Sequence, residues 1–244
     1  MMRATIRPAG LRLLLTPGVV ALGLLLLYFY IVNTPARLGD DQILTRVFLE
    51  DRLRQHVELV LASFALAAAI ALPLGIALAE TGRFWRLPIF ALASLGQIVP
   101  SIAALALAFT FIGLGFRPTI IALVIYALLP IIRNTVVGIQ AVDASIVEAA
   151  RGMGMSRLGT LAHVQLPLTA PAIFAGLRTA LVLVIGTATL GNFIGGGGLG
   201  DVISAGIGAG RDRIVLTGAG MVAALALLAD WGLGLIERAL TPRV

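Results

Sequence analysis

Between two long hydrophobic segments, from residue 148 to residue 167, the chain reads EAARGMGMSRLGTLAHVQLP. Ser145 is followed three residues later by Glu148, which predicts a capping box in which each side chain satisfies a free amide at a helix start. The short helix that follows is expected to stop at Gly152 or Gly154, because glycine tolerates the left-handed backbone at a helix end.

A second short helix is predicted to begin at Ser156, a residue type favoured at helix starts. Pro167 is expected to end it, because proline cannot donate the next backbone hydrogen bond. Two short helices joined by a glycine hinge, at the surface of a membrane, predict a docking element.

Composition places the chain among membrane proteins. It has 244 residues, of which 59% are hydrophobic and 12% charged, and its mean hydropathy is +1.02. A soluble domain of this size would not keep so much apolar surface dry, so we predict an all-α membrane protein with several spans. There is no cysteine and no lysine, and all eighteen basic residues are arginine. Without lysine there is no Walker A motif, so ATP would have to bind another chain.

The hydrophobic runs predict about six transmembrane helices. They cover roughly residues 16–32, 57–79, 88–113, 118–137, 171–193 and 214–236. Residues 33–56 are polar with an apolar stripe, which predicts an amphipathic helix at the outer surface. Prolines inside the spans either line a path or make packing kinks, and those considered for the path are Pro73, Pro100 and Pro130.

Charge predicts the orientation. With the N-terminus inside, the inner stretches hold eleven arginines and five acids, whereas the outer stretches hold seven of each. The positive-inside rule therefore places the N-terminus and the 143–167 loop in the cytoplasm. The pI near 11.1 reflects arginines scattered at helix ends, so no nucleic-acid partner is expected.

Motifs in the loop resemble the EAA signature of ATP-binding-cassette importer permeases. The resemblance rests on Glu148-Ala149-Ala150, on Gly154, and on Val164, Leu166 and Pro167, with Val164 standing where isoleucine is usual. It implies a loop that docks on the ATPase subunit. The residues expected to couple the two subunits are Glu148, Ala149, Ala150, Arg151, Gly152, Gly154, Leu166 and Pro167.

Further stretches are similar to the permeases of osmoprotectant importers, which move glycine betaine, choline or carnitine. These stretches are QIVPS at 97–101, YALLPIIRNT at 126–135 and GGLGD at 197–201. The resemblance implies a five-helix type I importer permease core in residues 43–244, preceded by an additional helix and linker in residues 1–42. It also implies a bacterial inner-membrane location and alternating access.

The implied assembly contains a cytoplasmic ATPase dimer, a second permease subunit and an extracytoplasmic substrate-binding protein. ATP and Mg would bind the ATPase, so no cofactor, metal or catalytic residue is expected in this chain. A related importer for an amino acid or another small solute is the alternative within the class. Outside the class, a membrane scaffold and an intramembrane aspartyl protease stay open, the latter on Gly-Leu-Gly-Asp at 198–201 with Asp230 as the second acid.

Arg178 and Asp230 are ionisable residues that enter the predicted spans. Arg178 lies about 10 Å and Asp230 about 9 Å from the inner ends of spans five and six. Charges at that depth need partners, so we predict that they pair, the alternative being that each reaches the cytoplasm separately. Candidates for the translocation path, each equally explicable as a packing group, are Gln97, Pro100, Ser101, Tyr126 and Asn134.

Overall fold

A computed structural model describes residues 9–36 and 40–241 of the chain, and within these ranges it contains helices and no strand. In chain order the helices are α1 (Ala9–Asn33), α2 (Asp40–Ile43), α3 (Arg46–Ala79), α4 (Arg83–Ile98), α5 (Ser101–Ile112), α6 (Phe116–Gln140), α7 (Ala144–Gly152), α8 (Arg157–Thr160), the π-helical turn η1 (Leu161–Gln165), α9 (Leu166–Ala188), the 3-10 turn η2 (Thr189–Ile194), α10 (Leu199–Ala209) and α11 (Asp212–Leu240). The prediction of an all-helical chain is confirmed.

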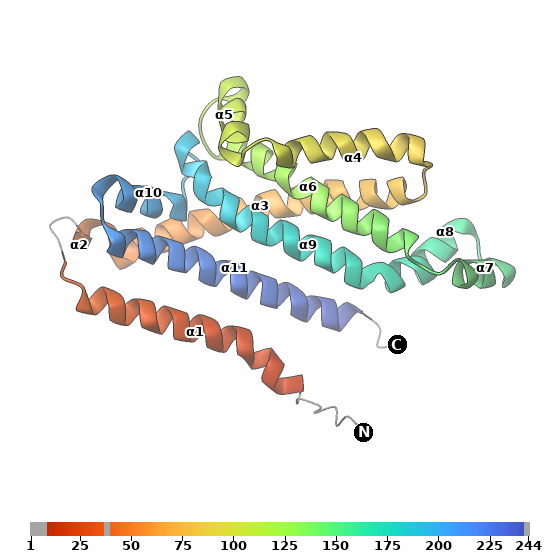
Figure 1. Cartoon of the computed structure of the whole chain (residues 1–244), viewed down its shortest axis with the longest axis horizontal. Helices are drawn as coiled ribbons and strands as arrows, with labels where there is room; N and C mark the ends of the chain where they lie inside the picture. Colours follow the sequence, from red (N-terminus) through yellow and green to blue (C-terminus); the bar gives the residue numbers. More distant parts are fainter. Residues whose placement is uncertain (1–8, 37–39, 242–244) are drawn as a thin grey trace.

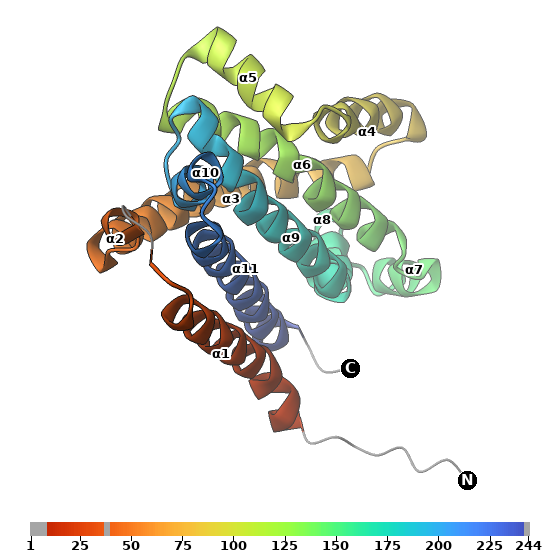
Figure 2. The same ribbon diagram turned by 60° about the vertical axis from the view of Figure 1, so that its left-hand side comes forward.

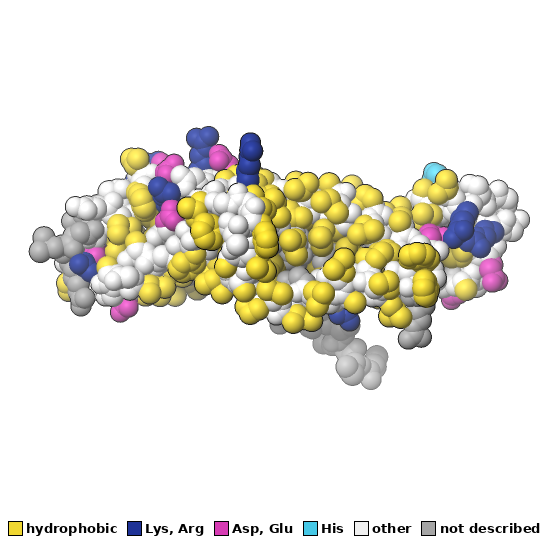
Figure 3. Space-filling model, turned by 90° about the horizontal axis from the view of Figure 1, so that it is seen from above, with side chains coloured by type: hydrophobic (Ala, Val, Ile, Leu, Met, Phe, Trp, Pro, Cys, Tyr) yellow, Lys and Arg dark blue, Asp and Glu magenta, His cyan; other side chains and the backbone are white. Residues whose placement is uncertain are grey.

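Five helical segments are long and apolar enough to cross a membrane. They are Leu14–Asn33, Arg46–Ala79, Phe116–Gln140, Arg157–Ile194 and Asp212–Leu240. These segments lie side by side along the long axis of the molecule (Figures 1 and 2). On the face seen in Figure 3, hydrophobic side chains cover the middle of the molecule and charged side chains gather mainly toward its two ends. This distribution is typical of a protein that lies across a bilayer.

The two ends of the molecule carry different elements. Helices α7 and α8 lie at one end, and the start of α1 and the end of α11 point toward that end, whereas α2 and α10 lie at the other end (Figure 1). The predicted topology likewise puts the start of the chain, the 143–167 loop and the end of the chain on one side.

The core lies where α3, α6 and α9 pack against one another. Glycines allow close approach there: a Cβ on Gly75 of α3 would lie 2.9 Å from Thr135 Cβ, and one on Gly138 of α6 would lie 2.5 Å from Thr169 Cγ2. Small residues let helix backbones approach in this way in membrane proteins. By contrast, only 6% of the most apolar stretch of α1 is buried within the molecule, compared with 61% of the corresponding stretch of α6. Helix α1 is therefore peripheral and packs on α11.

The third predicted span is not one helix. The expectation of a single helix over 88–113 is wrong, because the chain breaks at Val99–Pro100 into the shorter helices α4 and α5. Pro100 has no N–H to continue the helix, and a residue before proline is pushed to extended backbone, as the ψ of 126° at Val99 illustrates.

The separate amphipathic helix predicted within residues 33–56 is also wrong. Helix α3 begins at Arg46 and continues without interruption through Ala79, so the amphipathic part is the first third of a spanning helix. Thr45 caps its start, since the Thr45 hydroxyl accepts a hydrogen bond of 3.2 Å from the Phe48 amide. No glycine or proline follows until Pro73, so nothing in the sequence stops the helix earlier.

Candidate functional site

Helix α7 begins two residues earlier than the capping box requires. The residue at its N-cap is Asp143, whose carboxylate accepts a hydrogen bond of 2.8 Å from the Ser145 amide. This hydrogen bond lowers the pKa of Asp143. The predicted capping box of Ser145 and Glu148 is therefore wrong, because Ser145 is already inside the helix and Asp143 satisfies its amide.

The end of α7 is a Schellman motif centred on glycine. The Met155 amide donates to the Ala150 carbonyl (3.2 Å) and the Gly154 amide donates to the Arg151 carbonyl (2.9 Å). Gly154 has a φ of +92°, which glycine adopts without the steric cost of a side chain. Gly152 is the last helical residue, and Gly154 turns the chain.

Helix α8 begins after Ser156, whose hydroxyl accepts a hydrogen bond of 3.1 Å from the Gly159 amide. The expected helix end at Pro167 is wrong, because the chain continues through the π turn η1 into α9 with Pro167 in the first turn of α9. In the π turn the Leu166 amide bonds to the Leu161 carbonyl, five residues back. Two features explain why the helix continues past Pro167. The π turn shifts the register of the backbone hydrogen bonds, and Pro167 lies at the start of α9, where its missing N–H costs little.

The α7–α8 segment, residues 144–160, presents its side chains outward. Of the predicted coupling residues, five are exposed: Glu148, Ala149, Arg151, Gly152 and Gly154. Ala150 is only 2% exposed and packs inside the chain, whereas Leu166 and Pro167 are half-buried at the junction with α9.

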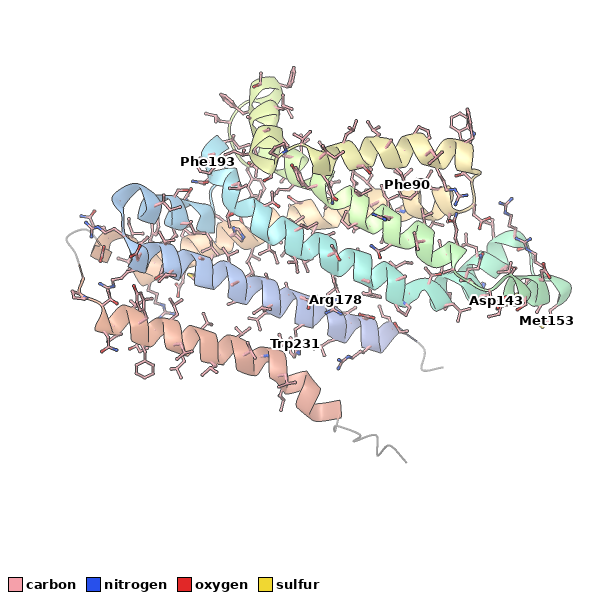
Figure 4. All side chains as sticks on the ribbon, in the orientation of Figure 1. Phe90, Asp143, Met153, Arg178, Phe193 and Trp231 are labelled. Carbon is pink, nitrogen blue, oxygen red and sulfur yellow. The ribbon has the colours of Figure 1, made fainter. Side chains whose placement is uncertain are left out.

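Two large apolar side chains stand beside these residues. Met153 is 78% exposed and Leu158 is 76% exposed, and Met153 lies at the tip of the segment (Figure 4). The residue types of Met153 and Leu158 alone did not predict that they would be exposed. Met153 nevertheless follows a predicted helix end, so a position near a turn was expected for it. Apolar side chains next to exposed charges at the end of a membrane protein fit a protein-docking surface.

A cavity of about 290 Å³ lies between α7 and the ends of α3 and α6. Its walls include Glu80, Gln140, Glu148 and Arg151. The Gln140 side chain donates to the Ala79 carbonyl at 3.3 Å, which ties the ends of α6 and α3 together beside this cavity.

Arg178 and Asp230 come together between α9 and α11. Arg178 Nε lies 2.7 Å from Asp230 Oδ1 and Nη2 lies 2.7 Å from Oδ2, so the pair is bidentate. Arg178 Nη1 also lies 3.5 Å from Glu237 Oε2. A cavity of about 260 Å³ opens beside the pair, with Thr16 and Trp231 in its wall, and Figure 4 places Arg178 and Trp231 near the middle of the molecule's length.

The predicted path residues fall into two groups. Pro130 cannot donate to the Tyr126 carbonyl, and the Gln97 side chain donates to that carbonyl instead, at 3.3 Å. The Tyr126 hydroxyl donates to the Val99 carbonyl at the break between α4 and α5. These hydrogen bonds place Gln97, Tyr126 and the break at Pro100 together.

The other path candidates are placed differently. Ser101 is the first residue of α5 and is half-buried. Asn134 lies two turns further along α6, where its side chain donates to the Pro130 carbonyl at 2.8 Å. A Cβ on Gly176 of α9 would lie 2.7 Å from the Asn134 Cβ, so Asn134 is a packing residue between α6 and α9.

The glycine-rich segment 195–200 is held against the start of α3. Asp201 pairs with Arg52 at 2.8 Å, and the Gly198 amide donates to the Gln55 side chain at 3.3 Å. Because Asp201 pairs with Arg52 and Asp230 pairs with Arg178, these two aspartates do not form the dyad of an aspartyl protease. Over residues 9–36 and 40–241 no group of three acidic or histidine residues is placed to hold a metal ion.

Comparison with known proteins gives a consistent result. The model of the family described as "Binding-protein-dependent transport system inner membrane component" matches residues 71–242. The carnitine transport permease protein OpuCB of Listeria monocytogenes is 42% identical over 189 residues, covering 78% of this chain and 86% of the relative. The choline transport system permease protein OpuBB of Bacillus subtilis (strain 168) is 39% identical, covering 77% and 86%.

A third relative and a solved structure extend the comparison. The glycine betaine/carnitine/choline transport system permease protein OpuCD of Bacillus subtilis (strain 168) is 43% identical, covering 72% of this chain and 77% of the relative. A structure of the MetNI methionine ABC transporter in an inward facing conformation matches with a TM-score of 0.71 at 22% identity, covering 80% of this chain and 96% of the matched chain. This structural match shows the fold.

Proposed function

The chain belongs to the family of binding-protein-dependent transport system inner membrane components, and from this membership we propose that it is the permease subunit of an ATP-driven importer for a quaternary ammonium osmoprotectant. The substrate class comes from relatives whose names specify carnitine, choline and glycine betaine, at 39–43% identity over most of the chain. Glycine betaine, choline and carnitine share a quaternary ammonium group, so one pathway suited to that group would serve all three.

The proposed assembly contains a second permease subunit, two cytoplasmic ATPases and an extracytoplasmic binding protein. ATP and Mg bind the ATPases, because this chain has no lysine and therefore no Walker A motif. The chain itself is a transport subunit and carries out no hydrolysis. The ATPase would dock on the α7–α8 segment, where Met153 and Leu158 supply apolar contact next to Glu148 and Arg151.

The proposed orientation places the α7–α8 segment and the start of α1 in the cytoplasm of a bacterial cell, with α2 and α10 outside. The arginine excess in the sequence stretches predicted to face inside supports it, since arginine-rich loops stay on the cytoplasmic side. In this orientation Arg52 and Asp201 lie at the outer face, where a loaded binding protein would approach.

The proposed transport cycle is alternating access. ATP would bring the two ATPases together, move the α7–α8 segments with them and open the permease outward, and hydrolysis would reset it. The break at Pro100 is the proposed point of flexibility along the path, because Val99 and Pro100 leave the helical hydrogen-bond ladder there. Gln97 and Tyr126 lie beside it, and the Tyr126 ring offers a face that attracts a quaternary ammonium group.

One observation carries the proposal: the exposed, independently capped α7–α8 segment bearing Glu148-Ala149-Ala150 and Gly154. The test is ATPase activity of the complex purified through a tag on this chain and reconstituted in liposomes. Binding protein loaded with glycine betaine, carnitine or choline is expected to stimulate hydrolysis. Glu148→Arg is expected to abolish the stimulation. The matched control is Arg238→Glu, an exposed residue at the end of α11 on the same proposed side, and it is expected to keep the stimulation.

The possible outcomes separate the parts of the proposal. Stimulation by methionine or another amino acid in place of the three osmoprotectants would keep the coupling role and overturn the substrate class. If no ATPase co-purifies with the chain, the proposed function as a whole is wrong.

A further inference from the structure

One ion pair fastens the α7–α8 segment to the transmembrane body. Arg157 Nε lies 2.8 Å from Glu80 Oε2, Nη2 lies 2.8 Å from the same oxygen, and Nη2 reaches the Glu80 carbonyl at 3.5 Å. The other side-chain hydrogen bonds made by described residues 144–160 stay within this segment and its immediate neighbours. Arg157 and Glu80 are 77 positions apart in the sequence.

Apolar burial adds little to this attachment. Within residues 144–160 the buried residues are Ala150, at 2% exposure, and Thr160, at 0%. Ile146, Met153 and Leu158 are exposed and make no core of their own. The orientation of the segment relative to the membrane helices therefore depends strongly on the Arg157–Glu80 contact.

Glu80 lies at the end of α3, a long helix that can transmit a displacement from one end of the molecule to the other. It caps α3, and its own amide bonds to the carbonyls of Ala77 and Leu78. Helix α3 is continuous over 34 residues, about 51 Å at 1.5 Å per residue, and it packs along α6 in the core. At the opposite end Arg52 holds Asp201 and Gln55 holds the Gly198 amide. Helix α3 thus connects the α7–α8 end of the molecule to the glycine-rich segment at the other end.

We propose that Arg157 and Glu80 are positioning residues for coupling, which pass the movement of the α7–α8 segment to α3. The inference rests on the proposed function, since it requires an ATPase that moves this segment. Arg157 is 67% exposed at its side chain and Glu80 is 27% exposed, and pairs of this kind contribute little to folding stability. Their loss is therefore expected to reduce coupling while the chain still folds.

The test uses charge reversal and rescue. In reconstituted importer, Glu80→Arg and Arg157→Glu are each expected to lower the solute imported per ATP hydrolysed by about fivefold, the factor that corresponds to ~1 kcal/mol. The double variant, in which the charges are exchanged, is expected to recover most of the loss. The matched control exchanges Arg54 and Glu58, an ion pair of 2.8 Å within α3 near its opposite end, and is expected to leave the ratio unchanged.

A second readout does not depend on the ATPase. The chain has no cysteine, so spin labels can be placed on Met153→Cys and Leu61→Cys, both exposed, without removing a native thiol. Glu80→Arg is expected to broaden the distance distribution between the labels, and the charge exchange is expected to narrow it again. An unchanged distribution, or a double variant no better than the singles, would overturn the inference. Failure of the wild-type importer to hydrolyse ATP would instead count against the proposed function.

Discussion

Replacing Asp230 by leucine tests how the α9–α11 interface is held. Asp230 accepts two hydrogen bonds of 2.7 Å from Arg178, and the two side chains are 34% and 37% exposed. Breaking a fully buried pair costs roughly 3–5 kcal/mol because one charge is left without a partner. Arg178 keeps Glu237 at 3.5 Å in the variant, and both groups are partly exposed, so we expect a loss of about half that, ~2 kcal/mol.

The assay is unfolding of the purified chain in mixed micelles, followed for Asp230→Leu, Arg178→Leu and the double variant. Each single variant is expected to lose about 2 kcal/mol of unfolding free energy. The double variant is expected to lose less than the sum by about 1–2 kcal/mol, because it leaves no isolated charge at position 178 or 230. Glu58→Gln, which breaks an exposed pair on α3, is the control and is expected to leave the unfolding midpoint in place.

Losses that add within about 0.5 kcal/mol would refute the reasoning, because additivity is the behaviour of independent sites. Exchanging the two charges is a poorer test than removing both. An aspartate at position 178 would face Glu237, which lies 3.5 Å from Arg178 in the native chain, so the exchange introduces a repulsion of its own.

Three further outcomes follow from local geometry. Gly138→Val is expected to destabilise the chain by about 1–3 kcal/mol in the same unfolding assay, since even a Cβ there would lie 2.5 Å from an α9 side chain. Gly186→Val is the control, because a Cβ at position 186 would have no atom within 4 Å. Gly154→Ala is expected to reduce stimulated ATPase activity severalfold because its φ is +92°. Gly186→Ala, at a helical position of α9 with open space around it and outside the α7–α8 segment, is expected to keep the activity. Asp143→Ala is expected to speed proteolysis within α7 while Asp143→Asn preserves the cap. Because the pKa of Asp143 is lowered, the carboxylate contribution to the cap is present above the ordinary carboxyl pKa and is lost only as pH falls through that lowered value.

Features that depend on local chemistry could be predicted from the sequence. The apolar spans, the glycine turn at 154 and the cap at Ser156 each follow from residue types within a few positions of one another. The ion pair between Arg178 and Asp230 could be predicted from the sequence for a different reason. Few ionisable residues enter apolar spans, and each of them needs a counter-charge.

Features that depend on distant surface residues could not be predicted in this way. Arg157 and Glu80 both lie in polar stretches where a charge needs no partner, so nothing in the sequence requires them to meet. The cap of α7 was missed because Asp143 and Ser145 are both good N-cap residues, and only the observed backbone decides between them.

The prolines explain why helix breaks were harder to predict than helices. Every proline inside a helix frees a carbonyl, and in a bilayer that carbonyl needs another donor or the helix must end. Three prolines differ in how this is resolved. At Pro130 the Gln97 side chain donates to the freed carbonyl. A π turn leads into Pro167, and before Pro100 the helix ends. The sequence indicates where a carbonyl is freed, but the solution depends on what packs beside it. Pro130 is buried within the α3–α6–α9 core and its helix continues, whereas Pro100 is exposed at the edge of the molecule and its helix ends.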